Sequence, residues 1–577
     1  MPPDCDSHSG RRDVLGFLDS RESRSAVESD PMAQPWQQNF DPLGNPILST
    51  ISAALPVFTL FYFLAVRRTA AWLAAVFGFI AAVVVALAVF HMPGHMVAGA
   101  VAAGMVYGWF RIAWIVVAAV FVYDLSVESG KFEVVKQSVG GISNDRRLQV
   151  LLIAFAFGAV LEGAGGAGAP VAISGAMMIG LGFPPFETAL LCLIANSAPV
   201  AFGGMGNPVR TLVAVTGLRE EDFSAMLGRI LPLTTLVLPF WLVRVLCKTR
   251  DTFAVWPGLL ACGVIFGAIQ FFWSNFMGNS LVDITAGTGT LVLLALFLKV
   301  WRPTKEWRYE GEPAAKQYDP TFGRVLLAWS PFILLSASVV LWGQAGVAKF
   351  LDSYSWKQPV YGLHLQVIRV PPVTLRPFAE PALFDVSWLS TPGTAVFFSG
   401  LIAGPLIGLS FRRTLQIFWQ SLWRLRLSLV AIMSMLGLGY VTRYCGMDAT
   451  MGMALAHTGV LFPFFGTMIG WLGVALSGTD AGSNALFGSL QMIAANKLGL
   501  SPVLMGAANS AGGVMGKMIA AQSLVIGCAV TGQQGQEGAL FRAVLKHSLG
   551  LLVVVGLIVV VYAYVFPGAV PNGHKYW

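Results

Sequence analysis

The chain has 577 residues, of which 56% are hydrophobic and only 11% are charged, and its mean hydropathy is +0.69. A typical soluble domain carries about 25% charged residues, so this composition excludes a water-soluble fold of this size. The formal net charge of +8 does not indicate nucleic-acid binding, because surplus Lys and Arg residues of membrane proteins collect in cytoplasmic loops. The six cysteines are scattered without a CxxC motif or a Cys/His cluster, so we expect no disulfide framework, metal site or cofactor.

The chain opens with a polar segment and then alternates apolar spans with loops. Residues 1–46 are polar and irregular, and Met32 offers a second start, so we expect residues 1–31 to be disordered or to precede the true start. A membrane span needs roughly 20 apolar residues. Apolar segments lie at 47–66, 70–90, 96–127, 148–160, 187–209, 226–247, 256–275, 281–302, 323–345, 393–411, 427–444, 461–475, 503–530 and 541–566. The sequence thus predicts an all-α integral membrane protein of about 12–14 transmembrane helices in two halves, 47–302 and 323–577.

Two loops set the orientation of the second half. Residues 303–322 lie in a region rich in Lys and Arg, which predicts a cytoplasmic loop. Residues 346–392 follow one span later and are predicted to form an insertion on the extracytoplasmic side. In the first half, basic residues at 131–147 and at 244–250 are expected to favour opposite orientations, so charge alone leaves the topology of the first spans open.

The two halves share an internal repeat. Residues 161–206 and 476–516 both open with Leu-x-Gly, continue through small residues into Asn-Ser-Ala (Asn196 and Asn509 are the first residues), and end in a glycine run. Helices interrupted by Gly and Pro at corresponding places in two halves point to a transporter binding site. We expect two inverted repeats, with re-entrant hairpins at 162–183 and 477–500 and with broken helices at 196–208 and 509–517.

Such breaks suit the binding of a small organic anion. Irregular backbone is tolerated at membrane depth only where it is buried in protein or lines a cavity, and free N–H groups at helix N-termini attract anions. Asn and Ser side chains add neutral donors. The predicted substrate-binding residues are Gly165, Gly166, Asn196, Ser197, Ser483, Asn484, Asn509, Ser510 and Lys517.

Titratable residues at apolar depth are the candidates for ion coupling. Glu162 and Asp480 lie one in each predicted hairpin, and intramembrane carboxylates are functional by default; the alternative is that they lock the hairpins by hydrogen bonds. His457 is a weaker candidate for proton coupling, and Arg443 a weaker one for the site. Lys517 could pair with the substrate, pair with Asp480, or extend to a membrane interface.

Nothing in the sequence indicates an enzyme. A Walker A sequence is lacking, which argues against a built-in ATPase, and no nucleophile or acid/base constellation occurs. The alternatives to a carrier are a channel and a membrane-bound enzyme subunit.

Four stretches carry a resemblance to a known family: FGAVLEGAGGAGAPVAI (157–173), ANSAPVAFGGMGNPV (195–209), GWLGVALSGTDAGSNALFGSLQ (470–491) and AANSAGGVMGKMI (507–519). They resemble the L-lactate permease family, from about residue 34 to the last helix. The resemblance implies a proton symporter of L-lactate, D-lactate and glycolate in the bacterial inner membrane, whose partners are the carboxylate, protons and membrane lipid.

The chain departs from the family pattern at two places. Gly165-Gly166-Ala167-Gly168 stands where the family shows Ala-Gly-Phe-Gly, and Ala520-Ala521-Gln522-Ser523 stands in place of Ser-Pro-Gln-Ser. These changes leave the preferred acid open. A sodium-coupled carrier of another carboxylate, such as a dicarboxylate, remains the alternative, and the sequence does not settle whether the chain forms homo-oligomers.

Overall fold

The computed structural model describes residues 35–571, except 68, 166–168, 310–320, 372, 374–375 and 534–535. The expectation for residues 1–31 lies outside the described residues. In the described part, nine helices are long and apolar enough to cross a membrane, or up to eleven spans exist if each of two bent helix pairs counts as one. The prediction of a helical membrane protein is confirmed, with 9–11 candidate spans in place of about 12–14.

The first half contains fourteen of the described α-helices. They are α1 (Pro46–Phe61), α2 (Ala71–Ala88), α3 (Gly94–Tyr107), α4 (Trp114–Glu128), α5 (Lys131–Gly140), α6 (Arg146–Gln149), α7 (Gly158–Gly165), α8 (Ala169–Gly180), α9 (Pro185–Ala195), α10 (Gly203–Thr216), α11 (Glu220–Leu246), α12 (Thr249–Phe253), α13 (Trp256–Phe276) and α14 (Val282–Val300). π-Helical turns at Gly108–Ala113 and Val150–Phe157 join α3 to α4 and α6 to α7, which makes two continuous spans.

The second half contains ten of the described α-helices and four short strands. The helices are α15 (Phe322–Gly343), α16 (Ala345–Asp352), α17 (Pro392–Leu406), α18 (Phe411–Cys445), α19 (Met447–Leu455), α20 (Phe462–Ser477), α21 (Asp480–Leu498), α22 (Pro502–Gly516), α23 (Ala521–Val530) and α24 (Glu537–Tyr564). The strands β2 (Trp356–Pro359), β3 (Val367–Arg369), β4 (Phe378–Ala379) and β5 (Leu383–Val386) belong to the insertion, and β3 pairs in parallel with β1 (Trp36–Gln37) from the N-terminal segment.

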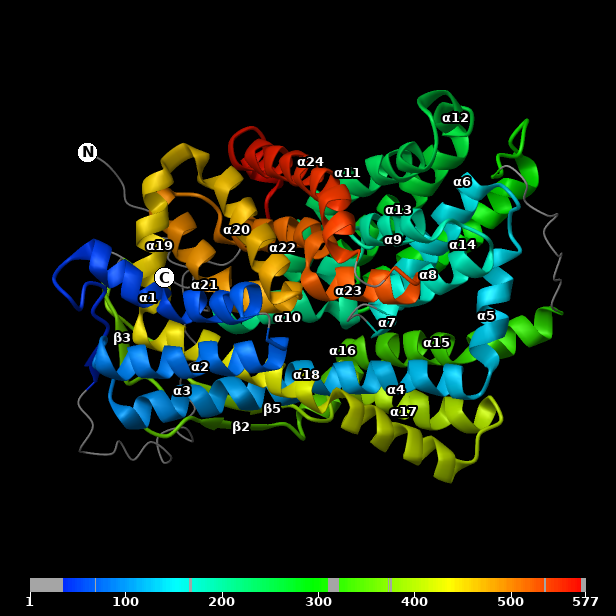
Figure 1. Cartoon of the computed structure of the whole chain (residues 1–577). Coiled ribbons are helices and arrows are strands. Elements are labelled where there is room, and N and C mark those ends of the chain that lie inside the picture. The colour runs from blue at the N-terminus through cyan, green and yellow to red at the C-terminus, as the bar shows by residue number, and fades with distance from the viewer. Residues whose placement is uncertain are drawn as a thin grey trace, which may run out of the picture.

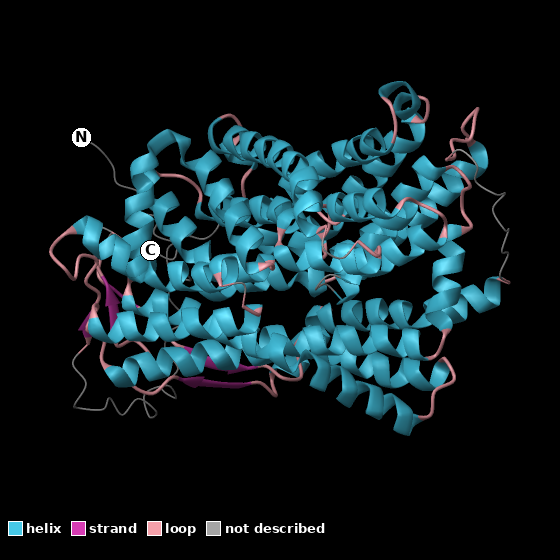
Figure 2. Cartoon of the chain, in the orientation of Figure 1, coloured by secondary structure: helices cyan, strands magenta, loops and turns pink. Residues whose placement is uncertain are grey.

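The helices form two layers (Figure 1). One layer contains α2, α3, α4, α15, α17 and α18, and the strands lie along one end of it (Figure 2). The other layer contains α7 to α11, α13, α14 and α20 to α24. Both members of the internal repeat lie in this second layer, so the first layer is the scaffold against which the repeats pack.

Contacts of Arg147 bring the basic loops to one end of the molecule. Its guanidinium donates to the carbonyl of Asp251 at 2.8 Å and to that of Lys305 at 2.9 Å. The basic residues near 147, near 250 and near 305 therefore share one side, which answers the question of relative orientation that charge alone leaves open. The positive-inside rule predicts that this side is cytoplasmic.

The hairpin turn of the second repeat lies at residues 478–479. Gly478 ends α20 in the left-handed conformation (φ 79°), and Thr479 caps α21 by accepting a hydrogen bond from the Gly482 N–H at 3.0 Å. The segment expected to form a hairpin, 477–500, is thus mostly the single helix α21, and the hairpin consists of α20 and α21. Acidic Asp480 sits in the first turn of α21, where the helix dipole favours it.

The Asn-Ser-Ala tripeptides differ between the repeats. In the first repeat Asn196 ends α9, and the chain bends by 60° before it continues into α10. In the second repeat Asn509 lies inside α22, which continues to Gly516 and bends by 41° only where α23 follows. The expected break at the second tripeptide is therefore wrong: its polar side chains bond to neighbouring helices while the helical backbone continues.

Glycines of the second repeat let α20 and α22 pack backbone against backbone. A Cβ at Gly512 would lie 2.9 Å from the carbonyl carbon of Thr467, and one at Gly516 would lie 3.0 Å from that of Trp471. Small residues permit such close approach in membrane helices. Part of the glycine run therefore serves packing.

Candidate functional site

Glu162 lies on α7 against the broken helix of its own repeat. Its side chain is buried, and a Cβ at Gly203 would lie 2.7 Å from its Oε1 atom. The side chain of Asn196 lies beside the carboxyl group. Neither amide atom of Asn196, nor Oε2 of Glu162, has a hydrogen-bond partner among the described residues. Hydrogen-bonding capacity is thus left unused at the point where α9 ends.

Asp480 has the corresponding place in the second repeat. Its carboxylate accepts a hydrogen bond from Ser510 Oγ, and its Oδ1 atom occupies the space that a side chain at Gly513 would need. Each hairpin acid therefore packs against a glycine from the run that follows Asn-Ser-Ala. Oδ1 of Asp480 also lacks a partner among the described residues.

Lys517 joins the two repeats. Its ammonium group is buried and donates to the Gly478 carbonyl at 2.7 Å, so it ties the end of α22 to the hairpin turn. It interacts electrostatically with both Glu162 and Asp480. Lys517 therefore does not extend to a membrane interface. Its ammonium group can pair either with Asp480 or with a bound anion.

Asp283 is a fourth charged residue of this cluster, which the sequence analysis missed. It lies in the first turn of α14, is 1% exposed, and interacts electrostatically with Glu162. A Cβ at Gly163 would lie 2.8 Å from the Asp283 Cβ, so the two helices touch here. Neither carboxyl oxygen has a partner among the described residues. An acid in the apolar run SLVDITAG was the available signal.

The remaining amides of the second repeat satisfy one another. Asn509 donates to Asn484 Oδ1 at 2.9 Å and accepts from Gln491 at 3.3 Å. Asn484 in turn donates to the Pro208 carbonyl on α10 at 3.1 Å, and Ser483 donates to the Gly470 carbonyl at 3.1 Å. These residues hold α21, α22 and α10 together, whereas Asn196 has no such bonds.

Other predicted site residues lie elsewhere or outside the described part. Ser197 is buried and donates to the Ile194 carbonyl at 2.7 Å. Gly165 ends α7, and Gly166 lies outside the described residues. His457 is exposed and contacts only backbone carbonyls of the preceding turn, so the structure does not bring it into the cluster.

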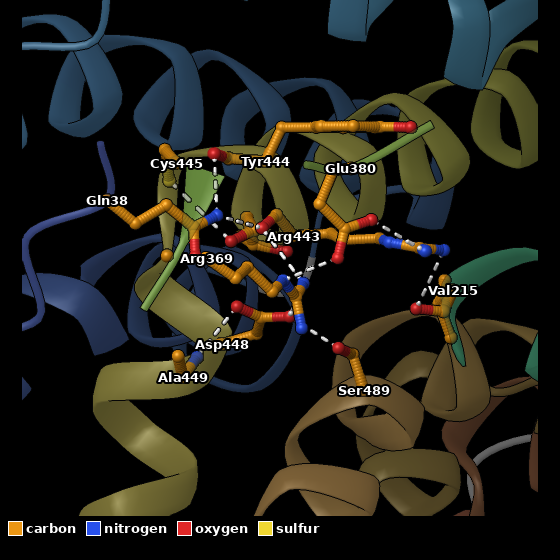
Figure 3. A network of polar contacts seen from close by, with 12 residues as sticks. Gln38, Val215, Arg369, Glu380, Arg443, Tyr444, Cys445, Asp448, Ala449 and Ser489 are labelled. Carbon is orange, nitrogen blue, oxygen red and sulfur yellow. Dashed lines mark hydrogen bonds and ion pairs between the residues drawn. The ribbon is translucent and has the colours of Figure 1, made fainter. Parts of the chain in front are cut away.

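Arg443 belongs to a separate ionic network near the insertion 346–392 (Figure 3). Glu380 contacts Arg369 at 2.7 Å and Arg443 at 3.0 Å, and Arg369 lies 3.5 Å from Asp448. Although burial opposes ionisation of Glu380, the two arginines hold its pKa below its ordinary value. Arg443 also donates to the Ala214 carbonyl at the end of α10 at 3.2 Å. These contacts place Arg443 outside the central cluster.

The central cluster can bind an anion and hold protons. Three carboxyl groups and one ammonium group are buried together, and they cannot all be ionised because an uncompensated buried charge is strongly unfavourable. Protonated carboxyl groups, or a bound cation, must balance the excess. The unused Asn196 amide and the Lys517 ammonium are donors for a carboxylate.

The chain is similar to known permeases along most of its length. The family model described as L-lactate permease matches residues 49–566. Glycolate permease GlcA of Escherichia coli (strain K12) is 42% identical over 555 residues, covering 92% of this chain and 99% of the relative. L-lactate permease of Salmonella typhimurium is 42% identical over 549 residues, covering 93% and 100%, and that of Bacillus subtilis is 38% identical over 568 residues, covering 93% and 100%.

Among solved structures, the match to MtrF of Neisseria gonorrhoeae covers 82% of this chain and 84% of the MtrF chain, with 13% sequence identity and a TM-score of 0.41. A likeness of that size decides nothing about the fold. The family match and the three permeases do decide the class. The chain belongs to the L-lactate permease family and is a multi-pass membrane transporter, not an enzyme.

Proposed function

We propose that this chain imports L-lactate and the related 2-hydroxymonocarboxylates D-lactate and glycolate, by proton symport across the bacterial inner membrane. The observation that carries the proposal is the buried cluster of Glu162, Asp283, Asp480 and Lys517 between the two repeats. The names of the relatives, lactate and glycolate permeases, supply the substrate class.

Opposite entry of the two hairpins supports the inverted repeat. The first hairpin begins at the cytoplasmic end, where the Arg146 N–H donates to the Trp307 carbonyl at 3.1 Å. The helix α19, which leads into the second hairpin, is fixed at the insertion end by Asp448 and by Thr450, whose hydroxyl donates to the Phe40 carbonyl at 3.0 Å. The α7–α8 and α20–α21 pairs accordingly lie at opposite ends of one layer (Figure 1).

The substrate carboxylate is assigned to Asn196 and Lys517. Asn196 is buried with both amide atoms free of hydrogen-bond partners among the described residues, and Lys517 is the cation that interacts with the same carboxyl group, Glu162. Ser483, Asn484 and Asn509 are already bonded to one another or to backbone, so in this proposal they shape the site and do not bind the substrate first.

Protons neutralise the rest of the cluster. An anion bound at Lys517 would leave three carboxyl groups without a cation, so binding favours their protonation. A site loaded with one anion and at least one proton carries less charge across the bilayer than an anion alone, which lowers the cost of crossing. Coupling of anion and proton follows from this balance.

Proteoliposomes that contain only this chain test the proposal. Proton and sodium gradients are imposed separately, with labelled L-lactate, D-lactate, glycolate and succinate outside. We expect uptake of the three monocarboxylates under the proton gradient and no response to sodium. Uptake that follows sodium without a pH gradient, or succinate as the preferred substrate, contradicts the proposal and supports the sodium-coupled alternative. Lack of saturable counterflow would indicate a channel.

A further inference from the structure

A cavity of about 650 Å³ lies at the cytoplasmic half of the molecule, away from the central cluster. It is partly open and is lined by residues of α9, α11, α12 and α24. Its basic lining consists of Arg244, Lys546 and His547, and Trp241, Phe240 and Phe253 are its aromatic residues. Among the described residues no acid lines it. The proposed transport mechanism uses none of these side chains.

The basic groups retain donors for which the described residues supply no acceptor. Arg244 donates one hydrogen bond, to the Cys247 carbonyl at 3.2 Å, at the end of its own helix. Lys546 is exposed and lies beside His547. A guanidinium group with free N–H groups and a neighbouring ammonium group match the oxygens of a phosphate ester.

His547 adds a third donor through its tautomer. Trp241 Nε1 donates to His547 Nδ1 at 3.1 Å, and the two rings meet edge to face. An Nδ1 atom that accepts a hydrogen bond carries no proton, so the neutral ring must carry it on Nε2. Trp241 thus orients the imidazole with an N–H group available for the cavity. Gly550 allows this arrangement, because a Cβ there would lie 3.2 Å from the Trp241 ring.

The surroundings of the cavity are those of a membrane interface. Phe253 and Val237, at 59% and 42% exposure, face outward from α12 and α11. The Phe240 and Phe253 rings lie 6.3 Å apart and form an apolar wall. The neighbouring α12 contains Asp251, whose carbonyl accepts a hydrogen bond from Arg147, and Arg147 also donates to the Lys305 carbonyl. This places α12 at the same end as the basic loop near residue 305, which is the cytoplasmic end. Basic pockets between membrane helices on this side bind anionic lipid head groups.

We propose that this cavity is a binding site for an anionic phospholipid of the cytoplasmic leaflet. The phosphate contacts Arg244, Lys546 and the Nε2–H group of His547, and the acyl chains follow the apolar wall formed by Phe240, Phe253 and Val237. This occupant fits better than a soluble phosphate because apolar and aromatic side chains line much of the cavity.

Native mass spectrometry of the full chain in a neutral detergent tests the site, with phosphatidylglycerol and phosphatidylcholine of equal acyl chains as probes. The double variant Arg244→Gln with Lys546→Gln is expected to bind phosphatidylglycerol roughly 30-fold more weakly, at about 1 kcal/mol per basic residue. Its phosphatidylcholine binding should not change. The matched control, Arg426→Gln with Lys349→Gln, removes the same charge from exposed positions outside the cavity and should bind as the unaltered chain does.

A second variant keeps every charge and fills the space. Val237→Trp should reduce retained phosphatidylglycerol as strongly as the double variant if lipid occupies the cavity. Equal losses in the double variant and its matched control would mean that overall charge attracts the lipid, and the proposal would be wrong. It would also be wrong if glycerol 3-phosphate bound as tightly as phosphatidylglycerol, because the acyl chains would then contribute nothing.

Discussion

The two buried ionic clusters of this protein differ in how completely their charges are paired. In the insertion network, two arginines face two acids, and every charged member contacts an opposite charge (Figure 3). In the central cluster, one lysine faces three acids, and several carboxyl and amide atoms have no partner among the described residues. Both are buried to a similar degree, so burial does not distinguish them.

We infer from this difference that the charges of the network are structural and that those of the central cluster are functional. A balanced network is costly to disturb and has little capacity left for a ligand. It fixes β3, α18, α19 and the end of α10 to one another. An unbalanced cluster with unused donors and acceptors has to be completed by something that comes and goes, which in a carrier is the substrate and its coupling ion. The comparison predicts that changes at the centre abolish transport and that changes in the network reduce stability.

The largest effect is expected from Asn196→Asp. An ionised aspartate side chain at position 196, roughly 4 Å from a carboxylate, costs about 4 kcal/mol at an effective dielectric constant of about 20, which is close to a thousandfold loss in affinity, and a protonated one still lacks the amide N–H donors. Uptake of L-lactate into proteoliposomes should be lost while the melting temperature stays near that of the unaltered protein. Asn39→Asp, at an exposed position, is the control. Normal uptake by Asn196→Asp would remove Asn196 from the site.

Amide variants of the three central acids should separate coupling from binding. Glu162→Gln, Asp283→Asn and Asp480→Asn retain size and remove a titratable proton. The variant of the proton carrier should lose uptake driven by a proton gradient and keep lactate exchange, because exchange needs no net proton movement. If all three variants keep gradient dependence, the proton crosses elsewhere or with the substrate as the neutral acid. If they lose exchange too, the acids bind substrate or hold the structure.

In the network, Arg369→Met is expected to destabilise the fold. Arg369 is 1% exposed and contacts both Glu380 and Asp448, so its removal leaves two acids facing only Arg443. Breaking a buried pair in this way typically costs about 3–5 kcal/mol. Thermal unfolding in detergent should show a clear drop in melting temperature, whereas Asn196→Ala should show almost none. Loss of transport at unchanged stability would contradict the structural role of the network.

The sequence predicts the centre better than the network, for a physical reason. Glu162, Asp480 and Lys517 stand out because each is a charged residue inside an apolar, glycine-rich repeat, where charge is costly. Asp283 has the same signature, but it lies near the start of the predicted span 281–302 and outside both members of the internal repeat, so the repeat does not single it out. Arg369 and Glu380 lie in a polar insertion, where charged residues are common and do not stand out. No local sequence pattern predicts their contacts with Arg443 and Asp448.

The positions of the helices can be predicted from hydropathy. Whether a helix breaks at an Asn-Ser-Ala tripeptide depends instead on the contacts that its side chains make in the folded protein. The first Asn-Ser-Ala ends a helix and the second does not, although the letters are identical. Asn509 has Asn484 and Gln491 as partners, so its side chain is satisfied without interrupting α22. The amide atoms of Asn196, although they lie beside Glu162, have no hydrogen-bond partner among the described residues. Tertiary environment, which the repeat does not encode, decides the outcome.

Lowering the pH should reduce the stability that the insertion network contributes. Burial opposes ionisation of Glu380, but Arg369 and Arg443 lower its pKa in the folded state. A carboxyl group whose pKa is lower in the folded than in the unfolded protein stabilises the folded state at pH values above its unfolded-state pKa, which is about 4.3 for Glu. That contribution to stability is lost as the pH falls through the pKa of the folded state. The melting temperature should therefore fall on acidification below about pH 4. The difference between the unaltered chain and Glu380→Gln should shrink over the same range; a constant difference would contradict the ionised state of Glu380.

The smallest effect is expected at the exposed ion pair of the same insertion. Lys357 contacts Asp352 at 2.8 Å, with side chains 46% and 41% exposed. Hydrogen bonds from Lys357 and Ser355 lower the pKa of Asp352 to about 2. Whatever this ion pair contributes to the stability of the folded state is therefore fully present above about pH 3.9, and it is lost as the pH falls toward about 2. Exposed pairs contribute about 0–1 kcal/mol, and 1 M salt screens them within about 3 Å. Lys357→Met should therefore leave the melting temperature nearly unchanged at pH 7, with still less effect in 1 M salt. The four β2–β5 residue pairs remain in place without it. A drop as large as that of Arg369→Met would mean that charge pairing, and not burial of balanced charge, holds the insertion, and the distinction between the two clusters would lose its basis.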